Sequence, residues 1–420
     1  MEKFDVAVMG GGTAGLIAAI QAGRAGAKTV LIEKNGICGG TMTVGGINKP
    51  GLFDAWGKQI IKGIGWELVT AALTLAGKKL PERFLDPDSN TRHWEHQIEL
   101  NPLLYAACGD QALLEAGVDI RYHTMSGALQ FSGNRWLVTL CEKDGLYDIE
   151  SKVVIDCTGD ANAVKQAGLP FTEHRITQPG TLSVRAHNFD LDKIDPAQLE
   201  KNFYAAVESG TILPGDLCWG KRFNTGFLKA GGKNKNHICN INGAESFGRT
   251  QMEIAGRASI LRSYRFLKQQ IGLENIEFDL SSPECGVRET RVIAGEHTIT
   301  RREYLAGISY PDAVCNAFYQ IDVHDGEEGL ISEKLAPGIV PQVPLRALIP
   351  QGSSNFLAAG RIISSDRAAN SALRVQAVCM ATGQAAGAVA AICAATNRSP
   401  LDIPKREWKE LLEKNEAVIP

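Results

Sequence analysis

The residues that most constrain the fold of this chain are Gly10–Gly15, a Gly-x-Gly-x-x-Gly sequence placed between two apolar segments. The segment before it, Phe4–Met9, predicts a short buried strand, and the spacing of apolar residues over 16–25 predicts a helix. A second apolar run, Thr29–Ile32, ends at Glu33. Together these segments predict a strand–turn–helix–strand unit of the Rossmann type.

Each position of this unit has a physical role in holding a dinucleotide. Gly10 permits a tight turn, Gly12 lets the backbone approach a pyrophosphate, and Gly15 lets the helix pack closely on the sheet. The first helical turn offers backbone N–H donors and the positive end of the helix dipole to phosphate. Glu33 can accept hydrogen bonds from ribose hydroxyls and would repel a 2′-phosphate. We therefore expect a dinucleotide site rather than a purely structural glycine turn.

A second glycine-rich loop, Ile37–Asn48, follows Glu33 directly. Glycine makes up 44 of the 420 residues, about 10% against a usual figure of roughly 7%, and this loop and the first one concentrate the excess. An NAD-binding domain has no use for a second loop here, whereas FAD is longer and needs contacts further along the sheet edge. Thr41 and Thr43 are suited to bond the pyrophosphate or the ribityl chain. The sequence therefore favours FAD over NAD.

Several segments resemble those of FAD-dependent oxidoreductases with the glutathione-reductase type of fold, among which the fumarate reductase and succinate dehydrogenase flavoproteins are the best-known relatives. The segments are Gly39–Thr41, Val153–Asp160, Leu357–Arg361 and Ser371–Gly387. Gly286–Arg291 is similar to a segment of the family usually called simply FAD-dependent oxidoreductase. The resemblance spans residues 6–387 and implies an FAD cofactor, but it is hardly specific for a substrate.

These segments supply the residues that we expect to contact FAD. They are Gly10, Gly12, Thr13, Ala14, Gly15, Glu33, Lys34, Gly39, Gly40, Thr41, Thr43, Gly46, Ser126, Thr158, Gly159, Asp160, Gly360, Arg361, Arg374 and Val375. The resemblance implies that the helix starting near Arg374 faces the pyrimidine end of the isoalloxazine, where reduced flavin carries negative charge. No histidine lies between Lys34 and Arg92 to attach the flavin, so non-covalent FAD is expected.

Arg288, Arg291 and His324 are the candidate catalytic residues. Arginine suits bidentate capture of a carboxylate, and in the fumarate reductase relatives an arginine also delivers the proton. Each arginine has the structural alternative of an ion pair with a nearby glutamate. His324 follows a strand-like alternation and has acidic neighbours, and its alternative is a structural or surface histidine. Further candidates are Asn48, Lys49 and His297.

The domain organisation is predicted from changes in composition and residue pattern along the chain. Strand–glycine–helix patterns fill residues 1–174 and return at 343–405, whereas 175–342 is richer in prolines, isolated aromatics and basic residues. We expect an α/β fold: a discontinuous Rossmann-like FAD-binding domain, with a parallel sheet flanked by helices, and an inserted mixed α+β substrate domain over 175–342. A C-terminal helix or tail is expected over 406–420. Residues 52–115 look mainly helical, beginning with the apolar stretch Phe53–Val69.

Charge and cysteine spacing exclude several other classes of protein. Lys plus Arg number 44 and Asp plus Glu 47, so no basic surplus indicates a nucleic-acid partner. The ten cysteines form no Cys-x-x-Cys pair, which argues against a zinc ribbon, an iron–sulfur run or a redox dithiol. His93 and His96 offer only two nitrogens, so no metal site is expected. The absence of a signal-peptide pattern and of a long uninterrupted apolar run predicts a cytoplasmic chain without a membrane span.

The sequence therefore predicts an FAD-dependent oxidoreductase that transfers a hydride between flavin N5 and a small organic substrate, and it leaves open whether that substrate is an anion. An external electron donor or acceptor is implied, and a homo-oligomer is left open. The main alternative is a flavin-bearing electron-transfer subunit of a larger redox complex. Two further classes are an NAD-dependent dehydrogenase, which the second glycine-rich loop disfavours, and a non-catalytic flavin-binding protein.

Overall fold

The computed structural model describes residues 1–87, 93–174, 176–220, 222–326 and 328–420, and a seven-stranded sheet lies at its centre. The strands run in the order β5–β2–β1–β8–β7–β6, with β18 also paired to β8. They are β1 (Glu2–Met9), β2 (Thr29–Ile32), β5 (Asp119–Arg121), β6 (Met125–Ser132), β7 (Arg135–Glu142), β8 (Gly145–Asp156) and β18 (Phe356–Ala358). Strands β5, β2, β1, β8 and β18 are parallel, and β6 and β7 form an antiparallel extension.

Strand β8 joins the parallel and antiparallel parts of the sheet. Along one edge it pairs with β1, with Val6 opposite Val153. Along the other edge it pairs first with β7, with Trp136 opposite Ser151, and then with β18, with Phe356 opposite Val154. The carboxyl ends of β1, β2, β8 and β18 therefore meet at one edge, which is where open parallel sheets bind ligands.

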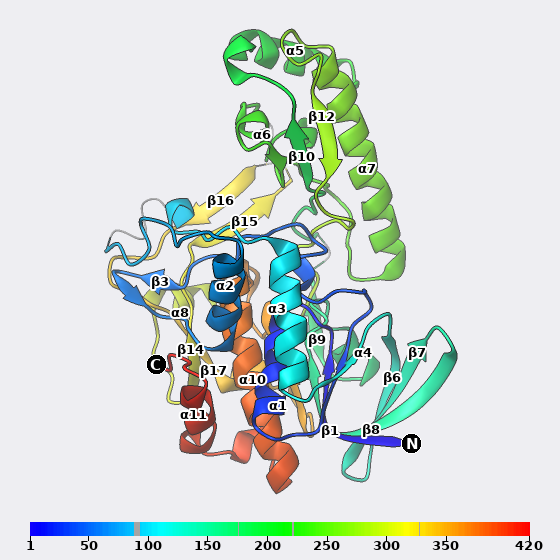
Figure 1. Cartoon of the computed structure of the whole chain (residues 1–420), viewed down its shortest axis with the longest axis vertical. Coiled ribbons are helices and arrows are strands. Elements are labelled where there is room, and N and C mark those ends of the chain that lie inside the picture. The colour runs from blue at the N-terminus through cyan, green and yellow to red at the C-terminus, as the bar shows by residue number, and fades with distance from the viewer. Residues whose placement is uncertain (88–92, 175, 221, 327) are drawn as a thin grey trace.

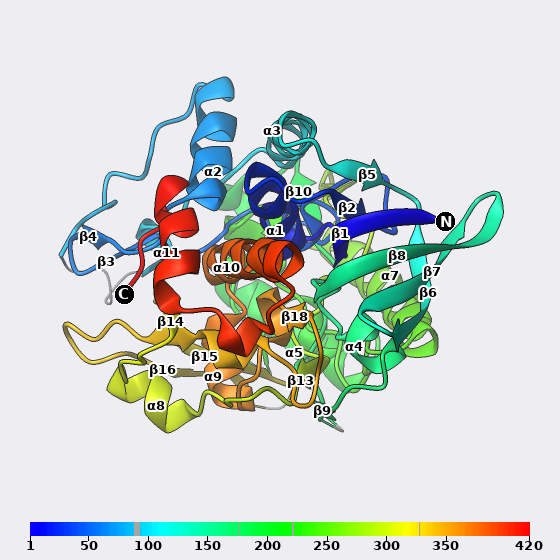
Figure 2. The ribbon, with the colours of Figure 1, turned by 90° about the horizontal axis from the view of Figure 1, so that it is seen from below.

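Helices α1 (Thr13–Arg24) and α10 (Gln376–Thr396) pack side by side against the sheet, as Figure 2 shows. They approach closely because α10 carries glycine where it crosses α1. A Cβ on Gly383 would lie 2.2 Å from Ala14 O, and one on Gly387 would lie 2.3 Å from Ala18 O. By length and composition α10 could cross a membrane, but 94% of its apolar window is buried inside the protein, as in a core helix.

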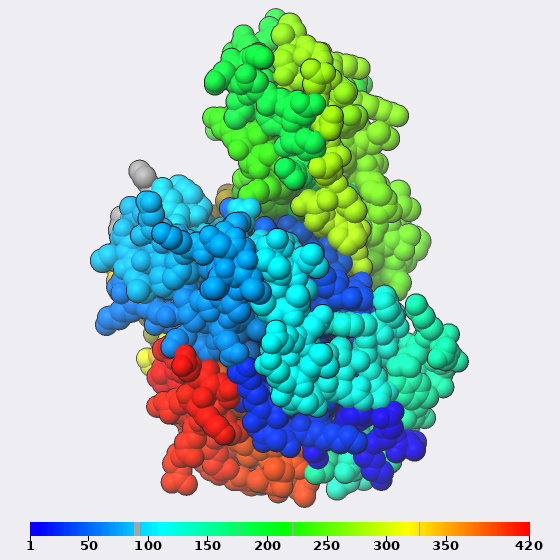
Figure 3. Space-filling model, in the orientation of Figure 1, coloured from blue at the N-terminus to red at the C-terminus, as the bar shows by residue number. Residues whose placement is uncertain are grey.

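Residues between β10 and β12 form a lobe that projects from the body (Figures 1 and 3). A three-stranded sheet, β11–β10–β12, runs along this lobe, and α7 lies beside it. A cluster of buried side chains that includes Phe203, Phe266 and Leu267 forms the core of the lobe. Its elements are β10 (Val184–His187), α5 (Pro196–Glu208), α6 (Gly226–Lys229), β11 (Gly232–Lys233), α7 (Ser246–Lys268) and β12 (Glu277–Leu280).

Short hairpins and helices complete the body. Two-stranded antiparallel sheets pair β9 (Phe171–Glu173) with β13 (Arg291–Ile293) and β14 (Ala313–Asn316) with β17 (Gln342–Pro344), and β15 (Ile321–Asp325) forms a hairpin with β16 (Gly329–Glu333). The helices of the body, besides α1 and α10, are α2 (Ile64–Leu75), α3 (Pro102–Glu115), α4 (Asn162–Gln166), α8 (Arg301–Ala306), α9 (Arg367–Leu373) and α11 (Lys405–Lys414).

The predicted α/β fold with a parallel sheet is confirmed, but the helix predicted over Phe53–Val69 is wrong over residues 53–63 and correct only from Ile64 onward. A hairpin of β3 (Asp54–Ala55) and β4 (Lys58–Gln59) occupies its first part, and α2 begins only at Ile64. Gly57 at φ +76° and Gly63 at φ +85° interrupt a helix there. The buried Asp54 carboxylate holds the hairpin in place, since it accepts a hydrogen bond from Leu85 N at 2.9 Å and lies 3.0 Å from His96 Nδ1.

Candidate active site

A cavity of about 800 Å³ opens at the carboxyl edge of the parallel strands. Its volume lies in the upper part of the range for ligand pockets, roughly 300–1,000 Å³. Most of the residues predicted to contact FAD line it, although they come from five separate segments of the chain. They are Gly10, Gly12, Thr13, Ala14, Glu33, Lys34, Gly40, Thr41, Thr158, Gly159, Asp160, Gly360, Arg361 and Arg374.

The three glycines of the first loop have different structural roles. Gly10 has φ +93°, and a Cβ there would lie 2.7 Å from Cys157 O; a Cβ on Gly15 would lie 1.8 Å from Gly10 O. The fold itself therefore requires glycine at both positions. At Gly12 an added Cβ would make only ordinary van der Waals contact, with Cys157 O at 3.9 Å, so the fold itself does not require glycine at this position of the cavity wall. Gly12 is also the N-cap of α1, and no side chain of the described residues caps that helix.

Glu33 presents a fixed carboxylate to the cavity. Its Oε2 accepts a hydrogen bond from Gly11 N at 2.7 Å, and its Oε1 accepts one from Asn35 N at 2.8 Å. Burial raises the pKa of this carboxyl group, although both backbone donors oppose that shift. The remaining lone pairs can accept hydrogen bonds from ribose hydroxyls, and the uncapped N-terminus of α1 can bind a pyrophosphate. The residues at this end therefore fit the adenosine part of FAD.

Other predicted cofactor residues support the cavity instead of lining it. Gly39 N donates a hydrogen bond to Gly11 O at 2.9 Å, and Thr43 Oγ1 donates one to Cys38 O at 2.8 Å, so both fix the second loop against the first. Ser126 Oγ donates to Gln166 Oε1 at 2.8 Å, and Val375 is the N-cap of α10. Gly46, at φ +69°, packs against the side chain of Ser282.

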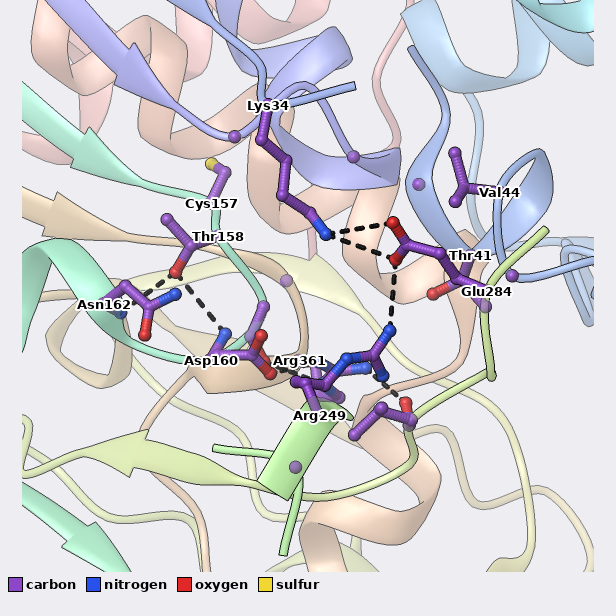
Figure 4. Close-up of a pocket in the computed structure, with 18 of the residues that line it drawn as sticks. Lys34, Thr41, Val44, Cys157, Thr158, Asp160, Asn162, Arg249, Glu284 and Arg361 are labelled. Carbon is purple, nitrogen blue, oxygen red and sulfur yellow. Dashed lines mark hydrogen bonds and ion pairs between the residues drawn. The ribbon is translucent and has the colours of Figure 1, made fainter. Parts of the chain in front are cut away.

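Arg361 holds the loop that follows β8 against the wall of the cavity (Figure 4). Its Nε donates a hydrogen bond to Gly159 O at 2.8 Å, and its Nη2 donates one to Asp160 Oδ1 at 2.8 Å. A further hydrogen bond runs from its Nη1 to Val287 O. Arg361 therefore ties the end of β18 to the end of β8 and to the chain that enters β13.

An ion-pair bridge that sequence analysis did not predict spans the same cavity. Glu284 lies 3.2 Å from Lys34 Nζ and 3.1 Å from Arg249 Nη2, as the dashed lines in Figure 4 show. Arg249 belongs to α7, and Glu284 follows β12. Because the partners are about 35 and 250 residues apart in the chain, no local pattern could have revealed the bridge.

A chain of buried polar side chains leads away from the other end of the cavity. Arg374 lines the cavity, donates from Nη2 to Asp322 O at 3.2 Å, and lies 3.6 Å from Asp322 Oδ2. The same carboxylate oxygen lies 3.3 Å from His324 Nε2. His324 Nδ1 in turn lies 2.9 Å from His237 Nε2. Sequence analysis predicted His324 and Arg374 but missed His237, which carries no recognisable pattern around it.

Arg288 is buried beside this row of polar side chains, with only 7% of its surface exposed. Its Nη1 donates a hydrogen bond to Pro179 O at 2.7 Å, and no carboxylate of the described residues lies within ion-pair distance. Burial and the charge of Arg374 lower its pKa, but a guanidinium remains a cation at neutral pH. A buried, unpaired cation is costly unless an anion joins it.

Burial and the charge of Arg288 keep the two histidines neutral. Both effects act together to lower the pKa of His237 to about 2 and that of His324 to about 4. Asp322 behaves in the opposite way: burial would raise its pKa, but the hydrogen bond to His324 and the charges of Arg374 and Arg288 lower it. At neutral pH the cluster therefore holds two guanidinium cations, one carboxylate and two neutral imidazoles.

Several buried polar atoms around this cluster have no hydrogen-bond partner among the described residues. Gln178, whose Oε1 accepts a hydrogen bond from His324 N, belongs to the same group of segments. Buried polar atoms are normally paired, so such a concentration fits a site that is completed by a ligand. The unpaired atoms are Gln178 Nε2, Ser183 Oγ, Asn236 Nδ2, His237 Nδ1 and Arg374 Nε.

Arg291 lines the cavity, yet its guanidinium is occupied by ion pairs. Its Nε lies 2.7 Å from Glu173 Oε2, and its Nη2 lies 3.2 Å from Glu245 Oε1. Arg291 begins β13 and Arg288 precedes it in a loop, so the two arginines do not share a helical face. The further candidates also have local partners: Asn48 donates to Leu100 O, Lys49 pairs with Glu99, and His297 pairs with Glu303.

The structure also bears on metal binding and on the cysteines. Among the residues that the structure describes, no three His, Cys, Asp or Glu side chains are arranged to hold a metal ion. All ten cysteines are free. Cys38 lies within the second loop and is fully buried, and burial raises its pKa to about 12, so it is an apolar packing residue in this structure.

The fold and the cavity define a dinucleotide-binding α/β protein with a buried polar site. The family described as FAD dependent oxidoreductase matches residues 5–412 of the chain. The chain belongs to this family, so it is an oxidoreductase and its cofactor is FAD. The uncapped α1 N-terminus, the fixed Glu33 carboxylate and the position of Gly12 in the cavity wall fit that cofactor.

Solved structures are similar to this chain at low sequence identity. A flavoprotein/dehydrogenase from Cytophaga hutchinsonii has 14% identity and a TM-score of 0.44, over 98% of this chain and 82% of that one. A geranylgeranyl bacteriochlorophyll reductase-like protein from Thermoplasma acidophilum has 15% identity and a TM-score of 0.43, over 99% and 84%. For an aromatic hydroxylase of angucycline biosynthesis, with 15% identity and a TM-score of 0.31, the match spans 46% of this chain and only 38% of that one. No curated protein matches the sequence significantly.

Proposed function

We propose that this protein transfers a hydride between FAD and a small organic anion whose carboxylate binds Arg288. The observation that carries the proposal is the burial of Arg288 without a carboxylate partner among the described residues. The guanidinium offers further N–H donors beyond the bond to Pro179 O, in the planar fork that suits a carboxylate. A substrate anion would both pair the charge and be oriented by it.

The cavity provides the place for the cofactor. We assign the N-terminus of α1 to the pyrophosphate, Glu33 to the adenosine ribose, and the neighbourhood of Arg374 to the flavin end. When bound there, FAD supplies the acceptor or donor of the hydride. This assignment orients FAD along the cavity. Glu33, at the end of β2, and Arg374, in the segment before α10, both line the cavity but belong to different parts of the fold.

The protein's own groups then have separate tasks. Arg288 orients the substrate, and Asp322 fixes both Arg374 and His324 through its carboxylate. Because Asp322 pairs with Arg374 and no carboxylate of the described residues pairs with Arg288, the cluster keeps a net positive charge that favours an anionic ligand. Burial strengthens this electrostatic selection, since water screens it poorly there.

The experiment is an anaerobic titration of the purified protein with carboxylic acids, alcohols and amines, followed by the loss of the flavin absorption band. Arg288→Gln should retain FAD but lose reduction by acids, with acid affinity falling about tenfold to a hundredfold, because a hydrogen bond to a charged group contributes about 1.5–3 kcal/mol. Arg406→Gln, which changes an arginine that is 85% exposed on α11, is the matched control.

Three outcomes would contradict the proposal. If neutral alcohols or amines reduce the flavin equally fast in the unchanged protein and in Arg288→Gln, the substrate is not an anion held by Arg288. Loss of FAD from Arg288→Gln would place that residue in the cofactor site. Flavin that no small molecule reduces, but that a partner protein reduces, would favour the electron-transfer subunit.

A further inference from the structure

The hydrogen bonds that connect Asp322, His324 and His237 have only one consistent direction. An ionised carboxylate only accepts hydrogen bonds, so the proton of His324 lies on Nε2, 3.3 Å from Asp322 Oδ2. A neutral His324 then has a bare Nδ1, which must accept the hydrogen bond from His237 Nε2 at 2.9 Å. A neutral His237 is left with a bare Nδ1, an acceptor that has no partner among the described residues.

This arrangement resembles a catalytic base with its orienting partners. Asp322 and His324 fix the tautomer and the ring of His237, while Trp219 holds the pair laterally with ring centroids 5.0 Å from His324 and 6.4 Å from His237. His237 is 95% buried, because only 5% of its surface is exposed. Asp322 and His324 thus orient the His237 ring, and no described residue donates a hydrogen bond to its Nδ1. A buried acceptor of this kind is placed to receive a proton from a ligand.

We propose that His237 Nδ1 accepts the hydroxyl proton of a 2-hydroxy acid whose carboxylate is held by Arg288. The proposal rests on the proposed function and names its substrate class. His237 is the catalytic residue, and Asp322 and His324 are positioning residues that act through it.

The charges of the cluster favour a hydroxy acid over an amino acid. Asp322 pairs with Arg374, Glu289 pairs with Arg367, and Arg288 has no carboxylate partner among the described residues, so the ammonium group of an amino acid would meet an unpaired positive charge. A hydroxyl group is neutral and can donate its proton to a bare imidazole nitrogen. Arg288 Nη1 bonds Pro179 O, and the next residue, Gly180, pairs with Ile238 beside His237, so Arg288 and His237 lie in adjoining segments.

The reaction balances with the groups named. The C–H bond of the hydroxyl-bearing carbon breaks and its hydrogen leaves with two electrons, as a hydride, to FAD. The O–H bond breaks and its proton forms an N–H bond with His237 Nδ1, while the carbon–oxygen bond becomes a carbonyl. The product is a 2-oxo acid, and the proton on His237 is later released to solvent.

Substrate binding also strengthens the base. The charge of Arg288 is one of the causes that lower the pKa of His237 and His324. A carboxylate bound to Arg288 opposes that charge, so the histidines gain proton affinity only when the substrate is present. The base is therefore weak in the free site and becomes stronger in the complex.

The first test reads the tautomers without any turnover. In protein labelled with 15N-histidine, NMR should find His237 and His324 neutral at pH 7, each protonated at Nε2 and bare at Nδ1. Asp322→Asn should disturb the tautomer of both rings, because an amide can donate where the carboxylate could only accept. A proton on Nδ1 of His237 in the unchanged protein would overturn the proposal.

The second test identifies the substrate class. Lactate, glycolate and both enantiomers of 2-hydroxyglutarate are compared, under anaerobic conditions, with the deoxy acids propionate, acetate and glutarate and with alanine, glycine and glutamate. Only the hydroxy acids should reduce the flavin. His237→Gln should slow reduction about a hundredfold to ten-thousandfold, the range for a general base, while pyruvate still perturbs the flavin spectrum. His187→Gln, a half-exposed histidine of the lobe, is the control.

The outcomes separate this proposal from the function on which it rests. Reduction by another class of acid, abolished in Arg288→Gln, would overturn the hydroxy acid and leave the function standing. FAD-loaded protein that no acid reduces would overturn both. Loss of pyruvate binding and FAD from His237→Gln would mean a structural role, and the NMR tautomers would then decide whether His237 faces a ligand.

Discussion

Lys34 and Glu284 form an ion pair of 3.2 Å that joins the two sides of the cofactor cavity. Lys34 follows β2, and Glu284 follows β12 of the projecting lobe and also pairs with Arg249 of α7. The Glu284 carboxylate thus pairs with two cations, Lys34 and Arg249, that border a site for an anionic cofactor. The bridge couples the lobe to the sheet, but it also removes positive charge from the cavity.

Glu284→Gln should therefore strengthen FAD binding a few-fold, because Lys34 and Arg249 become free to attract the pyrophosphate. The gain should shrink as salt rises, since both cations are partly exposed and screening extends over about 8 Å at physiological ionic strength. Fluorescence titration of the apoprotein with FAD at low and high salt measures the effect. Unchanged or weaker binding at low salt would show that the bridge contributes to the site by its geometry.

Gly12→Ala and Gly15→Ala should have different effects. Gly12 has φ −66°, and an added Cβ would make only ordinary van der Waals contact with the protein at the cavity wall, so alanine should leave the fold intact and obstruct the cofactor. Overpacking costs about 1–3 kcal/mol, which corresponds to a loss of FAD affinity of about tenfold to a hundredfold. At Gly15 the Cβ would lie 1.8 Å from Gly10 O, so that variant should fail to fold. Thermal unfolding of both apoproteins and FAD titration of the first distinguish the two effects.

Arg361→Gln should reduce stability more than the loss of an exposed ion pair would. The substitution removes the hydrogen bonds to Gly159 O and Asp160 Oδ1 and leaves Asp160 without its cation. A cost of about 2–4 kcal/mol is expected for a partly buried charged network of this kind. Urea unfolding measures it, with Arg406→Gln as the exposed control. A change of less than about 0.5 kcal/mol would mean that other contacts hold the loop after β8.

Acid should destabilise the folded chain through the buried histidines. Burial and Arg288 lower the pKa of His324 from 6.5 to about 4. Between these values the unfolded chain binds a proton that the folded chain does not, so this contribution is complete above pH 6.5 and is lost as the pH falls toward 4. It amounts to about 3 kcal/mol. The slope of urea-unfolding free energy against pH should become shallower in His324→Gln, and an equal slope in both proteins would contradict the assignment.

The cofactor half of the site could be predicted because its chemistry is local. Gly10, Gly12 and Glu33 lie within one strand–turn–helix–strand unit, where spacing in the sequence is nearly spacing in space. The strands over 4–9 and 29–32 and the helix over 376–396 were predictable for the same reason, since each has one dominant periodicity. Phe53–Val69 was not, because Gly57 and Gly63 break a stretch whose apolar residues have helical spacing.

The proposed substrate half is assembled from distant segments, so the sequence suggested Arg288, His324 and Arg374 separately but neither their arrangement nor His237. His237, Arg288, Asp322 and Arg374 come from four separate parts of the chain and meet only when β15, the lobe and α10 are in place. Arginine chemistry suggested Arg288 and Arg291 equally. Only the fold distinguishes them, because Arg291 forms ion pairs with Glu173 and Glu245, whereas Arg288 pairs with no carboxylate among the described residues.

The close packing of α1 on α10 has a consequence for the order of events during synthesis. Helix α1 is complete at Arg24, yet the helix that covers it begins only at Gln376. At translation rates of about 5–20 residues per second, the apolar face of α1 waits on the order of tens of seconds for its partner. Nascent chains of this protein therefore expose the future cofactor loop and its helix for most of their synthesis, and chaperones that shield apolar segments have their longest opportunity there.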